Sequence, residues 1–240
     1  MKQLLLDVLA APAPTLENYV PGPNTEALET LRTLPPGRAV YLWGPAGCGR
    51  THLLRALSAH AGAVYLDSRS PVSAYKRAAQ PEDAEARPGL VAIDDLHLLD
   101  EARLGAVFTL YNRWRELTAT DMALSLIVAG ELAPGQLEIR EDLRTRLGWD
   151  LVFRLDVLSD AEKTDALIRQ AASRGLNLAP EVVNWILTHY ERDMRQLTAL
   201  LDALDHYSLA AKRPITLPLL RAMLAEQHQS SSPQPHSSLS

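Results

Sequence analysis

Short apolar runs alternate with stretches of helical periodicity as far as residue 158. The run 39–43 (AVYLW) is apolar at every position, as expected of a strand that is buried on both faces of a sheet. Similar runs predict further strands at 64–67, 90–93, 124–129 and 152–155. Helical spacing of apolar residues predicts helices at 24–34, 51–61, 71–80 and 101–117, with Asn24 as the N-cap of the first. Strands that alternate with helices predict an α/β fold, with a parallel sheet flanked by helices.

Beyond residue 158 the pattern becomes helical, and it predicts no further strand. Ser159 and Glu162 have the spacing of a capping box, which marks the start of a helix. Gly175 is the expected stop of that helix. Three more helices are predicted at 180–190, 193–211 and 218–227. A small all-helical domain is therefore expected to follow the sheet, and the composition of 230–240 (SSSPQPHSSLS) is typical of a disordered tail.

Composition narrows the class of protein. The formal net charge of −5 argues against a large DNA-binding surface, because duplex affinity comes mainly from neutralising phosphates. The single cysteine, Cys48, fits a reducing cytosol. An acidic residue interrupts the apolar start at Asp7, which argues against a signal peptide, and no apolar run approaches the roughly 18 residues of a membrane span. A cytoplasmic protein with protein partners is expected.

A glycine-rich segment joins the first predicted strand to a helix. It matches G-x-x-x-x-G-K-[ST] except that arginine replaces lysine, and it consists of Gly44, Pro45, Ala46, Gly47, Cys48, Gly49, Arg50 and Thr51. Glycines let backbone N–H groups converge on phosphate oxygens, and the helix N-terminus adds positive potential. Thr51 is expected to bind Mg²⁺ through its hydroxyl. Arg50 forks across two oxygens and is bulkier than lysine, so phosphate binding should survive while hydrolysis suffers.

Two acids follow the predicted strand 90–93. Asp94 at the strand end is expected to hold Mg²⁺ through its water shell, and Asp95 to orient or deprotonate an attacking water. Asp95 is one methylene shorter than the glutamate that efficient ATPases use. A strand that ends in acids is a weak signal alone, but its position after the phosphate loop strengthens it.

These motifs and their order resemble the DnaA-related AAA+ family. The segment 16–24, with Tyr19 and Val20, resembles the stretch that binds adenine there, and His52 directly after the loop joins the expected nucleotide-binding residues. The box 143–149 is similar to the one that carries the arginine finger, which falls on Arg146. The segment 192–197 resembles the sensor-2 motif, whose arginine falls on Arg195. The small polar residue expected of sensor 1 is missing from 126–131.

Two features favour a subgroup of this family. The chain leaves no room after the helices for the DnaA helix-turn-helix domain, and it begins with Gln3, Leu4 and Leu6 in the spacing of a peptide that docks on the replication sliding clamp. With arginine in the phosphate loop, this combination resembles Hda, the regulatory inactivator of DnaA. The resemblance implies that the protein binds ADP or ATP with Mg²⁺, docks on the DNA polymerase III sliding clamp (beta subunit), and stimulates hydrolysis of DnaA-bound ATP.

The expected organisation is therefore an AAA+ P-loop NTPase fold followed by a helical lid. The predicted parts are a clamp-binding arm, a nucleotide-binding domain, a lid and a disordered tail, at 1–14, 15–157, 158–228 and 229–240. DNA is expected to be reached mainly through the clamp, and a homo-oligomer is left open. Two other hypotheses stand beside this one: an autonomous AAA+ ATPase, such as a helicase loader or initiator-like protein, and a DNA-associated adaptor with a vestigial phosphate loop.

Overall fold

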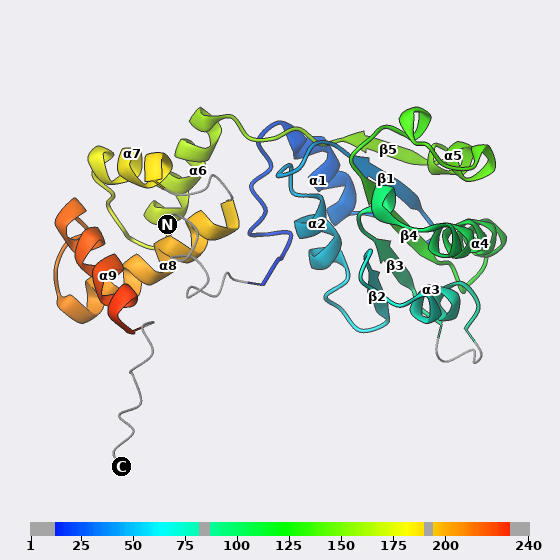
Figure 1. Ribbon diagram of the computed structural model, residues 1–240, viewed down its shortest axis with the longest axis horizontal. Coiled ribbons are helices and arrows are strands. Elements are labelled where there is room, and N and C mark those ends of the chain that lie inside the picture. The colour runs from blue at the N-terminus through cyan, green and yellow to red at the C-terminus, as the bar shows by residue number, and fades with distance from the viewer. Residues whose placement is uncertain (1–12, 82–86, 190–193, 231–240) are drawn as a thin grey trace, which may run out of the picture. The chain divides into compact units, whose positions relative to one another are not determined.

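The computed structural model describes residues 13–81, 87–189 and 194–230 (Figure 1). The chain divides into two compact units at the boundary between Leu158 and Ser159. The first is an α/β unit and the second is helical. The predicted clamp-binding residues Gln3, Leu4 and Leu6 lie outside the described residues, as does the predicted tail from residue 231 onward.

The α/β unit is built on a sheet whose neighbouring strands are all parallel, as the sequence predicts. The strands lie in the order β2-β3-β4-β1-β5. Their bounds are β1 Ala39–Trp43, β2 Ala63–Leu66, β3 Leu90–Ile93, β4 Ser125–Gly130 and β5 Leu151–Arg154. Parallel strands share one carboxyl edge, so the phosphate loop after β1 and the acids after β3 are on the same edge.

Helices cover both faces of this sheet (Figure 1). One face is covered by α1 (Thr25–Arg32) and α2 (Arg50–Leu57), and the other by α3 (Val72–Ala79), α4 (Glu101–Leu117) and α5 (Glu141–Leu147). Short 3₁₀ turns span Gly22–Asn24, Leu96–Leu98 and Pro134–Gln136.

The strand β1 explains why its sequence is apolar throughout. Val40 and Leu42 pack in the core beneath α1 and α2, whereas Ala39 and Tyr41 pack in the core beneath α3 and α4. All four are buried. Because successive side chains of a strand point to opposite faces, a strand with two covered faces needs an apolar residue at every position.

Two details at the helix ends differ from the expectation. The helix after the phosphate loop ends at Leu57 instead of near residue 61, and the Ser58 hydroxyl donates to the carbonyl oxygen of Leu54 at 2.6 Å. Asn24 precedes α1 but makes no side-chain capping bond. Its amide instead donates to the carbonyl oxygen of Asp156 at 2.9 Å and accepts from the Asp156 N–H at 2.8 Å. The prediction that Asn24 caps α1 through its side chain was therefore wrong.

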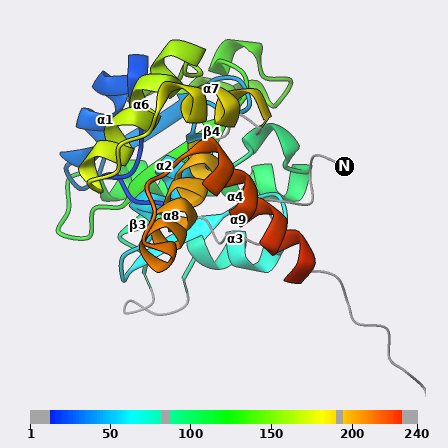
Figure 2. The ribbon, with the colours of Figure 1, turned by 90° about the vertical axis from the view of Figure 1, so that its left-hand side faces the viewer.

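The helical unit comprises α6 (Asp160–Ser173), α7 (Pro180–His189), α8 (Met194–Ala211) and α9 (Leu217–Ser230) (Figure 2). The apolar sides of these helices form a core of their own. The capping box of Ser159 and Glu162 is confirmed, since both of its hydrogen bonds are present. Gly175 follows α6 with φ +75°, a conformation that suits the glycine at a helix end. The last helix continues to Ser230, three residues past its predicted end.

Candidate nucleotide-binding site

The phosphate loop lies between β1 and α2, at the carboxyl edge of the sheet. A side chain at Gly44 would collide with the carbonyl oxygen of Leu155, and one at Gly49 would come within 2.5 Å of the Tyr19 ring. Gly49 also has φ +95°, in the region that favours glycine. Gly49 brings no side chain to the start of α2, so the N–H groups of the first turn can point toward an anion. The local geometry fits a phosphate group.

Tyr19 supports this loop from behind. Its side chain is buried, its hydroxyl donates to the carbonyl oxygen of Cys48 at 3.1 Å, and the Asn24 amide donates to that hydroxyl at 3.2 Å. Burial is the main reason that the pKa of Tyr19 rises to about 12. His52 lies beside it, with ring centroids 5.5 Å apart, and its Nε2 is 2.9 Å from the carbonyl oxygen of Thr15. Tyr19, in the segment expected to bind adenine, therefore lies against the phosphate loop, and its neighbour Val20 is half-buried.

Arg50 turns its guanidinium toward backbone carbonyls. The side chain is buried, and Nη1 donates to the carbonyl oxygen of Gly44 and, at 2.8 Å, to that of Gly130. Its Nη2 lies 3.6 Å from Glu131 Oε1. The guanidinium thereby joins the start of the phosphate loop to the end of β4. That the same group reaches phosphate oxygens stays a prediction.

Glu131, at the end of the predicted sensor-1 segment 126–131, is an acid and not the small polar residue expected there. It follows β4 directly, and the same Oε1 that faces Arg50 lies 3.7 Å from His97 Nε2. The sequence did contain a signal for Glu131 as a site residue, because Glu131 is an acid directly after a buried strand, as Asp94 is. A carboxylate in this place offsets the charge of Arg50.

Asp94 is 1% exposed and is held by two donors. The Tyr65 hydroxyl donates to Oδ2 at 2.9 Å, and the Asp95 N–H donates to Oδ1 at 2.9 Å. Tyr65, on β2, is a second residue that sequence reasoning missed, because nothing in its local sequence shows that β2 and β3 are neighbours.

Asp94 and Thr51 are the residues predicted to hold Mg²⁺, and their oxygen atoms suit this ion. No group of three or more potential metal ligands exists among the residues that the structure describes. Magnesium, however, is usually held by one or two carboxylates, waters and substrate phosphates, and not by an all-protein cage. A carboxylate has about four lone-pair sites, so the two donors on Asp94 leave others for a metal-bound water. Asp94 and Thr51 thus fit Mg²⁺ that arrives with a nucleotide.

Asp95 has an unusual backbone for its residue type. Its φ of +52° places it in the left-handed region, where the chain turns from β3 into the turn Leu96–Leu98. Burial first, and then the charge of Asp94, raises the pKa of Asp95, whereas His97 and Arg50 partly offset the rise. A carboxyl group with a raised pKa is a better proton acceptor, which suits the role predicted for Asp95.

Arg146 lies on α5 and contacts α4. Its Nη1 donates to the side-chain oxygen of Asn112 and, at 3.4 Å, to the carbonyl oxygen of Phe108. The guanidinium carbon is 3.7 Å from the Phe108 ring centroid and 5.2 Å from that of Trp149. Trp149 belongs to the predicted box 143–149, whereas no pattern in the sequence indicated Asn112 or Phe108.

The fold separates Arg146 from the phosphate loop of the same unit. Asp150, just before β5, accepts from the Arg38 guanidinium at 2.7 Å and the Ala39 N–H at 2.9 Å, at the amino end of β1. The phosphate loop starts after the carboxyl end of β1. The chain that bears Arg146 therefore leads into the edge of the sheet opposite the loop, and α5 and α2 lie on opposite faces (Figure 1).

Two parts of the predicted site lie where the structure describes no side chains. Arg195 belongs to the first turn of α8, and its side chain is outside the description. Arg192 and Asp193, from the same motif, lie outside the described residues, as do residues 1–12 of the arm.

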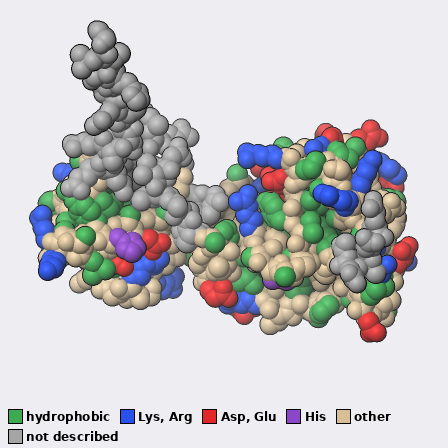
Figure 3. All heavy atoms as spheres, turned by 90° about the horizontal axis from the view of Figure 1, so that it is seen from below, with side chains coloured by type: hydrophobic (Ala, Val, Ile, Leu, Met, Phe, Trp, Pro, Cys, Tyr) green, Lys and Arg blue, Asp and Glu red, His purple; other side chains and the backbone are tan. Residues whose placement is uncertain are grey.

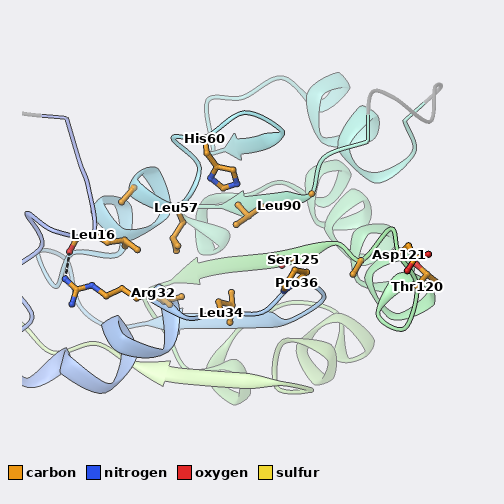
Figure 4. Close-up of a pocket in the computed structure, with 14 residues that line it drawn as sticks. Leu16, Arg32, Leu34, Pro36, Leu57, His60, Leu90, Thr120, Asp121 and Ser125 are labelled. Carbon is orange, nitrogen blue, oxygen red and sulfur yellow. Dashed lines mark hydrogen bonds between the residues drawn. The ribbon is translucent and has the colours of Figure 1, made fainter.

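A groove of about 730 Å³ lies at the other edge of the sheet (Figure 4). It runs past the starts of β3 and β4, at Leu90 and Ser125, and past the ends of α1 and α2, at Arg32 and Leu57. No residue of the phosphate loop lines it. The groove is therefore separate from the candidate nucleotide site.

Comparison with known proteins identifies the helical unit. Residues 160–224 match the family model described as "Hda, lid domain". The helical unit therefore matches the lid domain of the Hda family, and the chain shares its fold with DnaA. Domain III of the Thermotoga maritima replication initiation protein DnaA has 21% identity and a TM-score of 0.60, over 90% of this chain and 97% of that chain.

Other solved structures share the fold. AMPPCP-bound DnaA from Aquifex aeolicus has 21% identity and a TM-score of 0.60, over 82% of this chain and 66% of that chain. A Thermotoga maritima RuvB mutant has 15% identity and a TM-score of 0.60, over 89% and 72%. At these identities the likeness shows the fold, and it confirms the predicted AAA+ arrangement of a parallel sheet followed by a helical lid.

The surface of the AAA+ unit carries both signs of charge. On the face drawn in Figure 3, acidic and basic side chains are interspersed among the coloured residues. Within the described part of the chain, no helix combines the length and the apolar character needed to cross a bilayer.

Proposed function

We propose that this Hda- and DnaA-related AAA+ regulator binds ADP, docks on the DNA sliding clamp and promotes hydrolysis of DnaA-bound ATP. It would thereby negatively regulate the initiation of DNA replication. Gln3, Leu4 and Leu6 would bind the clamp, and Arg146 would act on the nucleotide of a neighbouring DnaA.

The geometry of Arg146 carries this proposal. Its guanidinium lies on α5, across the sheet from α2, and the chain beside it leads to the edge opposite the phosphate loop. A cation placed in this way suits a phosphoryl group on another subunit better than one on its own. An arginine supplied in trans stabilises the charge that develops as the phosphoryl group is transferred.

Within the chain's own site, the loop N–H groups would bind the phosphates of ADP. Thr51 and Asp94 would hold Mg²⁺, which supplies charge neutralisation between the phosphates. Tyr19 and Val20 belong to the segment that would lie near adenine, with His52 beside them. Arg195, on the first turn of the lid helix α8, would contact the phosphates of the bound nucleotide and so couple the lid to the nucleotide state.

The test is to mix the chain with DNA-loaded clamp and ATP-loaded DnaA and to follow hydrolysis of the DnaA-bound ATP. Hydrolysis should accelerate only when the chain, the clamp and DNA are all present. Unchanged hydrolysis, with a chain that still binds ADP, would exclude the regulatory role and leave the nucleotide site intact.

An autonomous ATPase is the second candidate, and the raised pKa of Asp95 favours it, because Asp95 is then suited to accept a proton from water. The two are separated by the turnover of ATP by the isolated chain. A value in the ordinary range of about 1–100 s⁻¹ would support the ATPase. Slow or absent turnover is expected, because Arg50 replaces the lysine of efficient sites.

A further inference from the structure

Tyr65 is the residue that connects β2 to the acid at the end of β3. The two strands pair in parallel, with Tyr65 opposite Ala92 and Leu66 opposite Ile93. From this position the Tyr65 hydroxyl reaches past the end of β3 to Asp94 Oδ2, at 2.9 Å. Tyr75, on the neighbouring α3, instead donates to the backbone carbonyl oxygen of Asp67.

The Asp94 carboxylate depends on such donors. It is 1% exposed, and its other oxygen, Oδ1, is occupied by the Asp95 N–H. A buried carboxylate is costly unless donors surround it, and two donors on different oxygens fix the plane of the group. Tyr65 therefore selects which lone pairs of Asp94 remain for another ligand.

Arg55 holds Tyr65 from the other side. Its guanidinium carbon lies 5.3 Å from the Tyr65 ring centroid, which is a cation–π contact. Arg55 belongs to α2, the helix that begins at the phosphate loop. The phenol O–H of Tyr65 is the donor in its hydrogen bond with the Asp94 carboxylate.

We propose that Tyr65, held by Arg55, is a positioning residue that orients Asp94 toward the Mg²⁺ of a bound nucleotide. The proposal rests on the proposed binding of a magnesium nucleotide at this site. The contacts link three elements that the metal site needs together: α2 after the phosphate loop, β2, and the end of β3 (Figure 1). Tyr65 would act through Asp94 and not as a metal ligand itself.

The experiment measures the affinity for ADP in the full chain as a function of Mg²⁺ concentration. Partners of metal ligands typically contribute 10–100-fold to metal affinity, and Asp94 acts through water, so Tyr65→Phe should raise the half-saturating Mg²⁺ concentration about tenfold. Affinity for ADP in EDTA should stay unchanged. A merely structural role would lower both affinities together.

Tyr75→Phe is the matched control, because it also removes a buried hydroxyl hydrogen bond but leaves Asp94 untouched. It should leave the Mg²⁺ dependence at the wild-type value. Arg55→Met should shift that dependence in the same direction as Tyr65→Phe, and it serves as the test if Tyr65→Phe does not fold. Asp94→Asn should abolish the dependence of ADP affinity on Mg²⁺.

An unchanged half-saturating Mg²⁺ concentration in Tyr65→Phe, or in Arg55→Met if that variant has to stand in, would overturn the inference. Equal losses in EDTA and in Mg²⁺ would also overturn it. If the wild-type chain binds no ADP, the proposed nucleotide site itself is wrong. If it binds ADP with the same affinity at every Mg²⁺ concentration, Asp94 holds no Mg²⁺ and the inference is overturned.

Discussion

The guanidinium carbon of Arg146 lies 3.7 Å from the centroid of the Phe108 ring. Asn112, one turn further along the same helix as Phe108, accepts a hydrogen bond from the same guanidinium. The arginine is therefore held in one orientation by a ring face and by a directional acceptor. Pre-ordering a flexible side chain lowers the entropy that is lost when it engages a partner.

Replacing Phe108 by leucine should weaken this arrangement while keeping an apolar side chain in the core. A cation–π contact contributes about 0.5–2 kcal/mol, so stimulation of DnaA-bound ATP hydrolysis should fall roughly two- to thirtyfold. The measurement compares hydrolysis rates at saturating clamp and DNA. The ADP affinity of the chain should be unchanged, and undiminished stimulation would show that Arg146 needs no support from the ring.

Arg146→Ala should retain ADP and clamp binding but lose stimulation. A cation aimed at a transferring phosphoryl group is typically worth about 10³–10⁵ in rate. Arg146→Lys should restore little, because lysine lacks the planar fork. Arg144→Ala, on the same helix, is the control. If Arg146→Ala loses its own nucleotide while Arg195→Ala loses only stimulation, the two arginines have each other's roles.

The two glycines of the phosphate loop with similar backbone angles should differ in their tolerance of alanine. Gly47 has φ +84° and open space where a Cβ would lie, so Gly47→Ala should cost only the backbone strain, about 1–2 kcal/mol of unfolding free energy. Gly49→Ala also meets Tyr19, which should add about 1–3 kcal/mol. Denaturant unfolding measures both.

Thermal melting with saturating ADP then tests the site, because a ligand that binds only the folded state raises the melting temperature. The rise should vanish in Gly49→Ala. An equal rise in Gly49→Ala and wild type would show that ADP binds elsewhere.

Alanine at Gln3, Leu4 and Leu6 together should abolish capture of the sliding clamp. The physical reason is that leucines fill an apolar pocket while the glutamine amide makes directional hydrogen bonds. Melting temperature and ADP affinity should match those of the wild type. Replacing Lys2 and Asp7 instead is the control, and clamp binding that survives the triple change would place the docking peptide elsewhere.

Asp95→Asn should make the chain more stable at neutral pH. Folding raises the pKa of Asp95. The free energy of unfolding is therefore greatest when the Asp95 carboxyl is protonated, and it decreases as the pH rises through the raised pKa. Asparagine removes that loss and tolerates the left-handed backbone at this position. The gain in melting temperature should disappear below the ordinary carboxyl range. A gain that is equal at all pH values would mean that charge is not its cause.

The local sequence determined much of this protein. The capping box at Ser159 depends on contacts within a few residues, and the apolar runs of the buried strands depend on the demand that both faces of a sheet be covered. Such requirements produce a regular pattern of apolar and polar residues along the chain. The parallel sheet and the helical lid could therefore be predicted from the sequence.

Only the tertiary structure decided which distant residues meet. Asn24 bonds the backbone of Asp156 instead of capping α1, Arg50 turns to the carbonyl oxygen of Gly130, and Tyr65 reaches Asp94. In each pair the strand order brings together residues that the sequence places far apart. A polar group in the interior takes whichever partner lies within about 3 Å, and the motif that contains it does not record that partner.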